Sequence, residues 1–346
     1  MPRVAIVLVT FNSARDLDAC FGSLATARLG GAEVVAVDNG STDGTPALVR
    51  EKFPWVTVVE SGSNLGFAGG NDVGIRRALD AGAEWVYLLN PDTDVDPGFL
   101  EEALAVGETD PRTAAVQSLL LLHPDRDRVN TAGNAIHFLG FGHCGAYRAE
   151  RATIAAEPRE IAFASGAAVL LRAAALREVG VFDEKLFLYQ EDQDLGIRLR
   201  LAGWRALLAP RSLVWHHYAF SRNRRKYFYL ERNRYIVLAK TLRLRSLLVL
   251  APFLLAADLA LLALAGAHGW LPEKLEAYRE LLSRPMRDHV RRERARIQAS
   301  RVVSDRELAR WFSSELEFEG LAGGWIPRLL RAPMALVWRV LRPLLG

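Results

Sequence analysis

The sequence predicts an α/β domain built on a doubly wound, mostly parallel sheet, with a helical C-terminal extension. Short apolar runs typical of buried strands alternate four times with helical segments within the first ninety residues, and the connections are short. The run from Trp85 to Leu89 is apolar at every position, as expected of a strand covered on both faces. A chain of 346 residues is long enough for one large α/β domain with additions, or for two domains.

Local signals justify the individual elements. Leu17, Cys20, Phe21 and Leu24 recur at helical spacing, which predicts a helix with one face toward the core. The Thr-Pro pair at 45–46 suits the start of a second helix, because proline is favoured at the first helical position. We expect strands at residues 4–9, 34–37, 56–59, 85–89, 114–122 and 167–171, and helices at 73–81, 97–106, 173–179 and from about 191.

Residues 123–160 break this regular pattern. The segment is rich in Gly, His, Arg and Asp, and its apolar residues follow no consistent period. We therefore expect a variable loop or hairpin near the substrate.

Composition favours a folded protein of a reducing compartment. Half of the residues are hydrophobic and 24% are charged, which allows a sizeable core and argues against global disorder. The two cysteines, Cys20 and Cys144, do not suggest a disulfide framework. Because the first apolar run is too short for a signal peptide, we expect the protein in the cytoplasm.

An acidic turn follows the fully apolar strand. Pro91 ends that strand, since proline has no N–H to donate to a neighbour, and Asp92 and Asp94 come directly after it. Ligands of open α/β sheets bind at this end of the strands. A divalent cation with substrate phosphates would remove the repulsion between the carboxylates. The alternative is a solvated acidic turn that caps the next helix.

The glycines between residues 66 and 70 do not fit a nicotinamide enzyme. They lack the G-x-G-x-x-G spacing, and they follow the third expected strand instead of the first. The Asn, Asp, Thr and Gly residues that follow several strands can nevertheless let backbone amides approach a nucleotide.

Six short motifs, in the same order and at plausible intervals, resemble family 2 glycosyltransferases of the rhamnosyltransferase-like branch. Each motif alone is weak, and together they cover about residues 3 to 240. The motifs are Thr10-Phe11-Asn12, Val37 to Gly44, Asn64 to Asn71, Leu89 to Asp92, Phe182-Asp183-Glu184 with Glu191-Asp192, and Gly203-Trp204.

This resemblance implies the GT-A fold and transfer of a sugar, with inversion, from a nucleotide donor such as dTDP-rhamnose or a UDP-sugar. The acceptor would be a hydroxyl of a saccharide or a lipid-linked saccharide. Two alternatives remain open. A sugar nucleotidyltransferase would need a Gly-rich first loop with Arg or Lys, which residues 10–13 lack. A non-catalytic nucleotide-sugar-binding protein would not need both acidic motifs.

The resemblance also assigns roles to residues. Asp192 would be the general base, Glu191 would position it or contact the acceptor, and Mg²⁺ or Mn²⁺ would be the cofactor. The metal would be held by Asp92 and Asp94 with His216 or His217. The first Asp of the family's D-x-D pattern aligns with Asn90, whereas a literal D-x-D is Asp92-Thr93-Asp94. The donor would contact Thr10, Phe11, Asn12, Asp38, Asn64, Gly66, Asn71 and Asn90.

The sequence divides into a catalytic domain at 1–240 and a helical extension at 241–346. Residues 247–267 are apolar except for Asp258 and are long enough to span a bilayer. A central aspartate costs roughly 2.5–3.5 kcal/mol on insertion, and both flanks are basic, so the usual charge asymmetry is missing. We therefore expect a helix that packs on the protein or lies at the membrane surface.

Basic residues gather near both ends of the extension. Arginines and aromatics interleave from Arg222 to Tyr235, a stretch that matches the family, so nucleic acid is not an expected partner. Near the end, Arg328, Arg331, Arg339 and Arg342 fall on one arc of a helix. Such a tail suits peripheral contact with the inner face of the cell membrane, although it could also be a helix closing over the core.

Overall fold

The computed structural model describes residues 2–217, 224–315 and 325–346. The chain forms two compact units. The first comprises residues 1–134, 144–199 and 204–219, and the second comprises 135–143, 200–203 and 220–346. The boundary expected at 240 and 241 stays a prediction.

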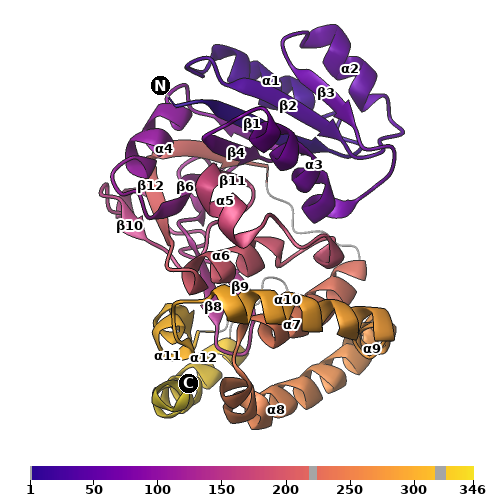
Figure 1. The fold of residues 1–346 in the computed structure, drawn as a ribbon, viewed down its shortest axis with the longest axis vertical. Helices are drawn as coiled ribbons and strands as arrows, with labels where there is room; N and C mark the ends of the chain where they lie inside the picture. The colour runs from indigo at the N-terminus through magenta and orange to yellow at the C-terminus, as the bar shows by residue number, and fades with distance from the viewer. Residues whose placement is uncertain (1, 218–223, 316–324) are drawn as a thin grey trace. The chain divides into compact units, whose positions relative to one another are not determined.

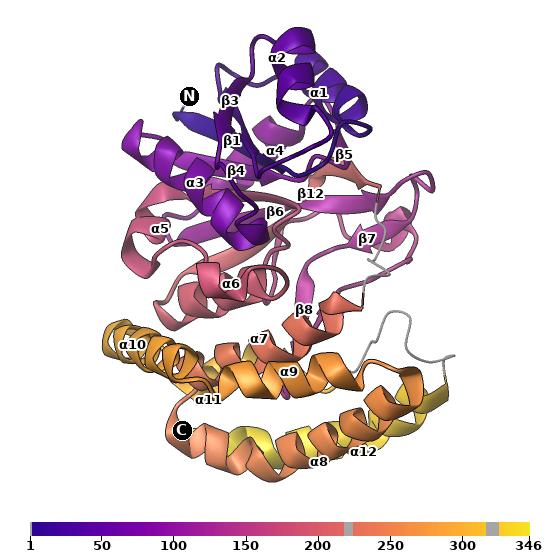
Figure 2. The same cartoon turned by 90° about the vertical axis from the view of Figure 1, so that its right-hand side faces the viewer.

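A mixed, mostly parallel sheet forms the centre of the first unit (Figures 1 and 2). Its main order is β10-β12-β6-β11-β4-β1-β2-β3, with β5 paired to β12 and β7 paired to β6. Strand β11 runs antiparallel to β4 and β6. The predicted fold class is confirmed. The strands are β1 (Val4–Thr10), β2 (Glu33–Asp38), β3 (Thr57–Glu60), β4 (Trp85–Leu89), β5 (Thr93–Val95), β6 (Thr113–Leu122), β7 (Val129–Thr131), β10 (Arg159–Glu160), β11 (Ala168–Arg172) and β12 (Arg205–His216).

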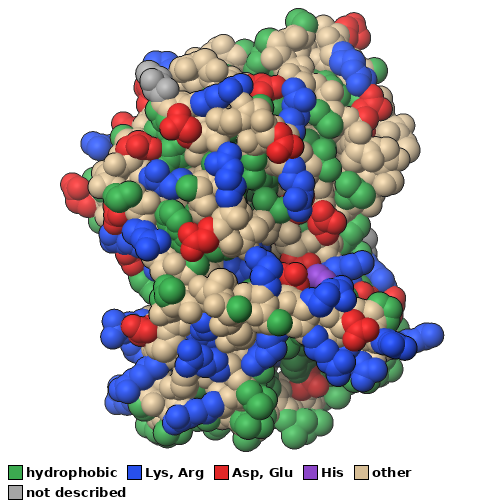
Figure 3. Space-filling view, viewed as in Figure 1, with side chains coloured by type: hydrophobic (Ala, Val, Ile, Leu, Met, Phe, Trp, Pro, Cys, Tyr) green, Lys and Arg blue, Asp and Glu red, His purple; other side chains and the backbone are tan. Residues whose placement is uncertain are grey.

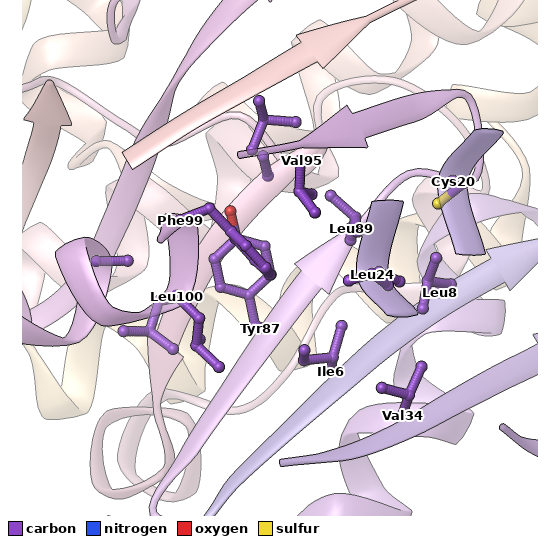
Figure 4. Packing of buried hydrophobic residues seen from close by; sticks show 14 of the residues in the cluster. Ile6, Leu8, Cys20, Leu24, Val34, Tyr87, Leu89, Val95, Phe99 and Leu100 are labelled. Carbon is purple, nitrogen blue, oxygen red and sulfur yellow. The ribbon is translucent and has the colours of Figure 1, made fainter. Parts of the chain in front are cut away.

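Helices cover both faces of this sheet (Figure 2). On one face, Ile6, Leu8 and Tyr87 pack in a single apolar cluster with side chains such as Leu24 and Phe99 of the helices (Figure 4). The four positions predicted from helical spacing at 17–24 are all fully buried, as expected of a core-facing stripe. The helices of this unit are α1 (Leu17–Thr26), α2 (Thr45–Lys52), α3 (Gly66–Asp80), α4 (Phe99–Gly107), α5 (Ala173–Val179) and α6 (Glu191–Leu201).

Helix α3 begins seven residues before the position predicted from the sequence. The glycines from 66 to 70 form its first turns instead of a loop. A Cβ at Gly70 would lie 2.7 Å from Cγ1 of Val9, and one at Gly74 would lie 2.3 Å from Cγ1 of Val7. The glycines are therefore needed for close packing of the helix on β1, a reason that helix propensity does not reveal.

The irregular segment at 123–160 contains short strands joined by turns. Two of them, β8 (Asn134–His137) and β9 (Gly142–Cys144), form a separate sheet with β13 (Phe312–Ser313). Strand β12 runs from Arg205 to His216 and contains an irregularity between Ala209 and Leu213.

The second unit is mainly helical (Figure 1). Charged residues Glu231, Lys274 and Asp258 form a buried or half-buried network within it, in which Lys274 Nζ lies 2.5 Å from Glu231 Oε2 and 2.9 Å from Asp258 Oδ1. Its helices are α7 (Arg225–Thr241), α8 (Leu244–His268), α9 (Leu271–Leu281), α10 (Arg284–Ser300), α11 (Asp305–Leu308) and α12 (Trp325–Leu341). Of the basic stretches noted in the sequence, Arg222 and Asn223 lie outside the described residues, as does the side chain of Arg328.

Helix α8 is the one described helix that is long and apolar enough to cross a membrane. Its most hydrophobic window has a mean hydropathy of 2.5, and only 6% of that window is buried. Asp258 turns toward α9, where Tyr278 donates a hydrogen bond of 2.5 Å to its carboxylate. One side of α8 therefore packs on the protein, while most of its apolar surface is exposed.

Candidate active site

Residues at the ends of β1 and β2 form the first part of the candidate site. Thr10 and Asp38 are neighbours in the parallel register, and the Thr10 hydroxyl lies 3.5 Å from Asp38 Oδ1. The other Asp38 oxygen accepts a hydrogen bond from the Ser41 amide. Both side chains are buried, so the strand register fixes their positions.

The loop after β1 is held by the loop after β2. Asn12 has a φ of 51°, its amide donates to Ser41 Oγ, and its side-chain oxygen accepts from the Thr42 amide. Phe11 is 46% exposed, which leaves an aromatic face open at the edge of the sheet. An exposed ring beside fixed polar groups suits stacking of a nucleotide base.

Asn39, which was not singled out from the sequence, organises the predicted donor residues 64 and 66. Its amide nitrogen donates to Gly66 O at 2.9 Å and approaches Asn64 Oδ1 at 3.3 Å. Its side-chain oxygen accepts from the Leu65 amide. The position directly after Asp38, in a turn rich in polar residues, was the sequence signal that could have identified it.

The remaining predicted donor residues have mainly backbone partners. Asn71 is buried in α3 and donates to Phe67 O at 2.9 Å. The Asn90 amide donates to Ala167 O, which ties the end of β4 to the residue before β11. The side-chain nitrogen of Asn71 is therefore engaged within α3, whereas the backbone amide of Asn90 fixes the position of the acidic turn.

The acidic turn pairs with two consecutive histidines at the end of β12. Asp92 Oδ1 lies 3.3 Å from Nε2 of His216, whose Nδ1 lies 2.9 Å from Asn130 Oδ1. Burial favours the neutral form of Asp92, but the hydrogen bond and charge of His216 outweigh it and lower the pKa of Asp92. His216 thus has partners at both ring nitrogens.

Asp94 forms a second group with His217 and His123. Its Oδ2 lies 3.4 Å from Nε2 of His217. The rings of His217 and His123 stack with centroids 3.9 Å apart. One potential ligand atom from each of the three residues lies within 4.8 Å of the others. His123 was not predicted, although its position directly after the expected strand at 114–122 could have suggested it.

A third carboxylate lies near this turn. Burial, followed by the charge of Asp92, raises the pKa of Asp16 at the start of α1. The concentration of negative charge expected at residues 92–94 therefore extends to a residue far away in the sequence.

The second predicted acidic motif lies at the start of α6. Asp192 Oδ2 accepts a hydrogen bond of 3.3 Å from the Gly166 amide, and its Oδ1 accepts from the Gln193 amide. Glu191 is almost completely buried. Burial raises the pKa of both carboxyl groups, and the charge of Asp192 adds to the effect at Glu191. Asp192 is the more exposed of the two.

The neighbouring acid at position 194 has a structural role. Asp194 is fully buried and pairs with Arg198 at 2.8 Å. The Arg198 guanidinium also donates to the carbonyl oxygens of residues 179, 180 and 181. This network fixes α6, and with it Asp192, on the preceding segment.

The segment before Glu191 has a strained backbone. Phe187, Tyr189 and Gln190 have φ values of 64°, 67° and 66°. Left-handed conformations of this kind cost energy in residues other than glycine and often occur at functional sites. The sequence gives no signal for them, because none of the three residues is Gly or Asn.

Comparison with known families agrees with the geometry. The family model "Glycosyltransferase like family 2" matches residues 2–235. An N-acetylglucosaminyl-diphospho-decaprenol L-rhamnosyltransferase of Mycobacterium tuberculosis is 33% identical over 240 residues, which are 63% of this chain and 77% of the relative. A hexosyltransferase of low-salt glycan biosynthesis in Haloferax volcanii is 24% identical over 57% of this chain and 61% of its own length.

Solved structures share the fold. GalNAc-T7, solved with UDP, GalNAc and Mn²⁺, has a TM-score of 0.56 and 15% identity over 69% of this chain and 48% of that one. A mannosyltransferase of Pyrobaculum calidifontis in complex with GDP-Man and Mn²⁺ has a TM-score of 0.50 and 20% identity over 86% of each chain. The chain has a GT-A-like fold and is a hexosyltransferase that belongs to glycosyltransferase family 2.

Proposed function

We propose that this protein transfers rhamnose from a nucleoside diphosphate donor to a hydroxyl of a lipid-linked saccharide, with inversion. The sugar is suggested by the 33% identical relative, whose name describes a rhamnosyltransferase acting on a diphospho-decaprenol-linked sugar. One observation supports the proposal most: Asp192 is hydrogen-bonded to the loop that precedes β11, and the turn that leads to Asp94 follows β4, the neighbour of β11 in the sheet. Transfer with inversion by this route would use a cation site that stabilises the departing diphosphate and a base that accepts the proton of the acceptor hydroxyl.

The donor would lie along the carboxyl ends of β1 and β2. In this arrangement Phe11 stacks on the base, and Thr10, Asn12 and Asp38 face the base and ribose. Asn64, Gly66, Asn71 and Asn90 line the sugar side of the pocket. Backbone amides of the loops after β1 and β2 are already held in place by side chains, which reduces the entropy lost on binding.

A divalent cation fits the Asp94, His123 and His217 group. A mixed set of one carboxylate and two imidazoles suits Mn²⁺ better than Mg²⁺, which prefers oxygen ligands. Asp92 and His216 form the neighbouring pair. They would either orient the metal ligands or act as ligands themselves. The cation would stabilise the negative charge that develops on the departing diphosphate.

Asp192 would accept the proton of the acceptor hydroxyl. The hydroxyl oxygen attacks the anomeric carbon, the bond from that carbon to the diphosphate oxygen breaks, and the proton moves to the Asp192 carboxylate. The two backbone amides that donate to Asp192 orient it, while Glu191 supports it from the buried side. A general base of this kind contributes about 10²- to 10⁴-fold in rate.

A lipid-linked acceptor would place the enzyme at the cytoplasmic face of the cell membrane. The exposed apolar surface of α8 is consistent with peripheral contact there. A product of this reaction would serve in the synthesis of a cell-wall or surface polysaccharide.

A donor screen tests the proposal. The protein is incubated with radiolabelled dTDP-rhamnose, UDP-sugars and GDP-mannose, with Mn²⁺, Mg²⁺ or chelator, and a saccharide-diphosphate-lipid acceptor. Thermal shifts report binding, because ligand at 100 times its dissociation constant adds about 2.7 kcal/mol of stability. Metal-dependent transfer from dTDP-rhamnose is expected. Binding without transfer would favour a non-catalytic protein, and release of pyrophosphate from a nucleoside triphosphate and sugar phosphate would favour a nucleotidyltransferase.

A further inference from the structure

Four arginines surround a pocket in the second unit. The pocket has a volume of about 520 Å³, and it lies between the segment around α11 and the end of α12. Arg306 and Arg310 line it on one side, and Arg339 and Arg342 line it on the other. All four side chains are exposed. A cavity with this charge is suited to a phosphate-bearing ligand, because guanidinium groups bind phosphate oxygens in pairs.

The positive charge of this pocket is only partly compensated. Within the described parts of the chain, none of the four guanidinium groups has an ion pair, whereas Arg331 of the same helix pairs with Glu315 at 2.7 Å. Glu307 also lines the pocket, but its carboxylate accepts hydrogen bonds from the amide and hydroxyl of Ser304, as part of a capping box. The hydrogen bonds from Ser304, and then the charge of Arg310, lower the pKa of Glu307, so this carboxylate offsets part of the charge of Arg310.

The wall of the pocket is well packed. Trp338 is buried, and its ring stacks on Phe138 with centroids 5.0 Å apart and an angle of 6° between the planes. Leu341 is also buried on the same helix. The helix that carries Arg339 and Arg342 is thus fixed by aromatic contacts, so its two guanidinium groups are presented from a defined surface.

An exposed apolar surface accompanies the arginines. Leu336 and Val340 are one helical turn apart on α12, and they are 62% and 57% exposed. Leu248 and Leu255 belong to a similar exposed stripe on α8. Beyond the end of α12, the Gly346 amide donates a hydrogen bond of 3.2 Å to Ser246 Oγ near the start of α8. Figures 1 and 2 show both helices on one outer side of the unit.

The charge and the apolar surface occur together on this unit. Figure 3 shows many Lys and Arg side chains over its visible face, with hydrophobic side chains at the edge where α8 and α12 lie. Soluble proteins rarely expose leucines in such stripes without a partner. Leucines beside arginines match the two layers of an anionic bilayer surface, the acyl chains and the phosphates.

We propose that the arginine pocket binds the phosphate headgroup of an anionic phospholipid while the leucine stripes of α8 and α12 enter the adjoining acyl layer. The occupant of this surface is a lipid bilayer. The proposal rests on the proposed function only for the cellular setting, because lipid binding by this pocket does not require sugar transfer.

Flotation with vesicles tests the proposal. The full-length protein is mixed, without donor or acceptor, with vesicles of phosphatidylcholine alone or of phosphatidylcholine with phosphatidylglycerol. The pocket variant carries R339Q and R342Q. A matched control carries R287Q and R292Q on α10, two exposed arginines outside the pocket with the same change in charge. Circular dichroism verifies that each variant is folded.

The wild-type protein should float only with the anionic vesicles. At about 1 kcal/mol for each arginine near an anionic surface, the pocket variant should lose roughly 30-fold in partition coefficient, and the control should lose much less. L336N/V340N should weaken flotation at unchanged charge. Equal losses of flotation in the pocket variant and the control would show that net charge alone explains the binding. That result would refute the pocket as a lipid-binding site. Binding of inorganic phosphate without flotation would assign a site for a free anion and overturn the lipid proposal.

Failure of flotation and failure of transfer can be told apart. Transfer is measured with soluble donor and a short-chain acceptor in the absence of vesicles. A protein that floats but transfers no sugar refutes the proposed function and leaves the lipid site intact. A protein that transfers sugar but does not float refutes the lipid site alone.

Discussion

Asp192 and Asn90 are held by adjacent residues of one loop. The Asp192 carboxylate accepts a hydrogen bond from the Gly166 amide, and the Asn90 amide donates to the carbonyl of Ala167. Asn90 directly precedes the turn that contains Asp92. Two acidic motifs separated by about a hundred residues are therefore attached to the same end of neighbouring strands, β4 and β11.

The first prediction concerns the pH dependence of transfer. A protonated Asp192 cannot accept a proton from the acceptor, and burial raises its pKa. The rate constant kcat should therefore rise with pH through a pKa above the ordinary range of an aspartate, and it should be lost as the pH falls through that value. A profile of kcat between pH 4 and pH 9, with saturating donor and metal, checks this prediction. An acid limb at the ordinary aspartate pKa of about 3.9 would contradict it.

The second prediction separates the two consecutive histidines. H217A and H123A should each weaken Mn²⁺ binding by at least about tenfold, because each removes a potential ligand beside Asp94. H216A should have a smaller effect, since His216 pairs with Asp92 and Asn130. Equilibrium titration of Mn²⁺ by electron paramagnetic resonance measures binding without relying on activity. A larger loss of Mn²⁺ affinity in H216A than in H217A would contradict this prediction. It would indicate that the metal binds to Asp92 and His216 instead.

The third prediction concerns Gly66. A Cβ at this position would lie 2.3 Å from the carbonyl oxygen of Phe187, and its φ is +72°. G66A should therefore cost about 1–3 kcal/mol in unfolding free energy and raise KM for the donor, because α3 or the strained segment before Glu191 must shift. G22A is the control, since a Cβ at Gly22 meets no atom within 4 Å. Urea unfolding compares the two, and equal stabilities would show that the close contact is unimportant.

The fourth prediction concerns stability in the second unit. His137 is fully buried, and burial lowers its pKa to about 3. Between that value and its unfolded pKa of about 6.5, the unfolded chain binds the extra proton, so stability falls as pH falls. H137Q should reduce the slope of unfolding free energy with pH by up to about 1.4 kcal/mol per unit. H268Q, which changes an exposed histidine, should retain the wild-type slope. Equal slopes in all three proteins would refute burial of a neutral His137.

Most of the sheet could be predicted from the sequence because its strands are short, apolar and separated by regular helices. The run at Trp85 to Leu89 became a strand with every residue buried, and the expected helix at 173–179 has those bounds. The start of α3 was missed because glycine is a poor helix former when only propensity is considered. The close approach of Gly70 and Gly74 to β1 depends on tertiary packing.

The site was predictable to the extent that it lies near strand ends. Asp92, Asp94 and the two histidines at the end of β12 were identified in this way, and they are paired in the structure. His123 and Asn39 were missed because their roles depend on which loops meet across the sheet. The positive φ values before Glu191 could not have been predicted, since the residues involved normally avoid them.

The rate of sugar transfer by D192N tests the central claim most directly. The amide in this variant retains the shape of the carboxylate but cannot take up the proton of the acceptor hydroxyl. The control is D125N, which changes an exposed aspartate. We expect kcat to fall by about 10²- to 10⁴-fold in D192N, while the donor-induced thermal shift stays at the wild-type value and D125N remains fully active. Wild-type kcat in D192N would contradict the assignment of Asp192 as the base.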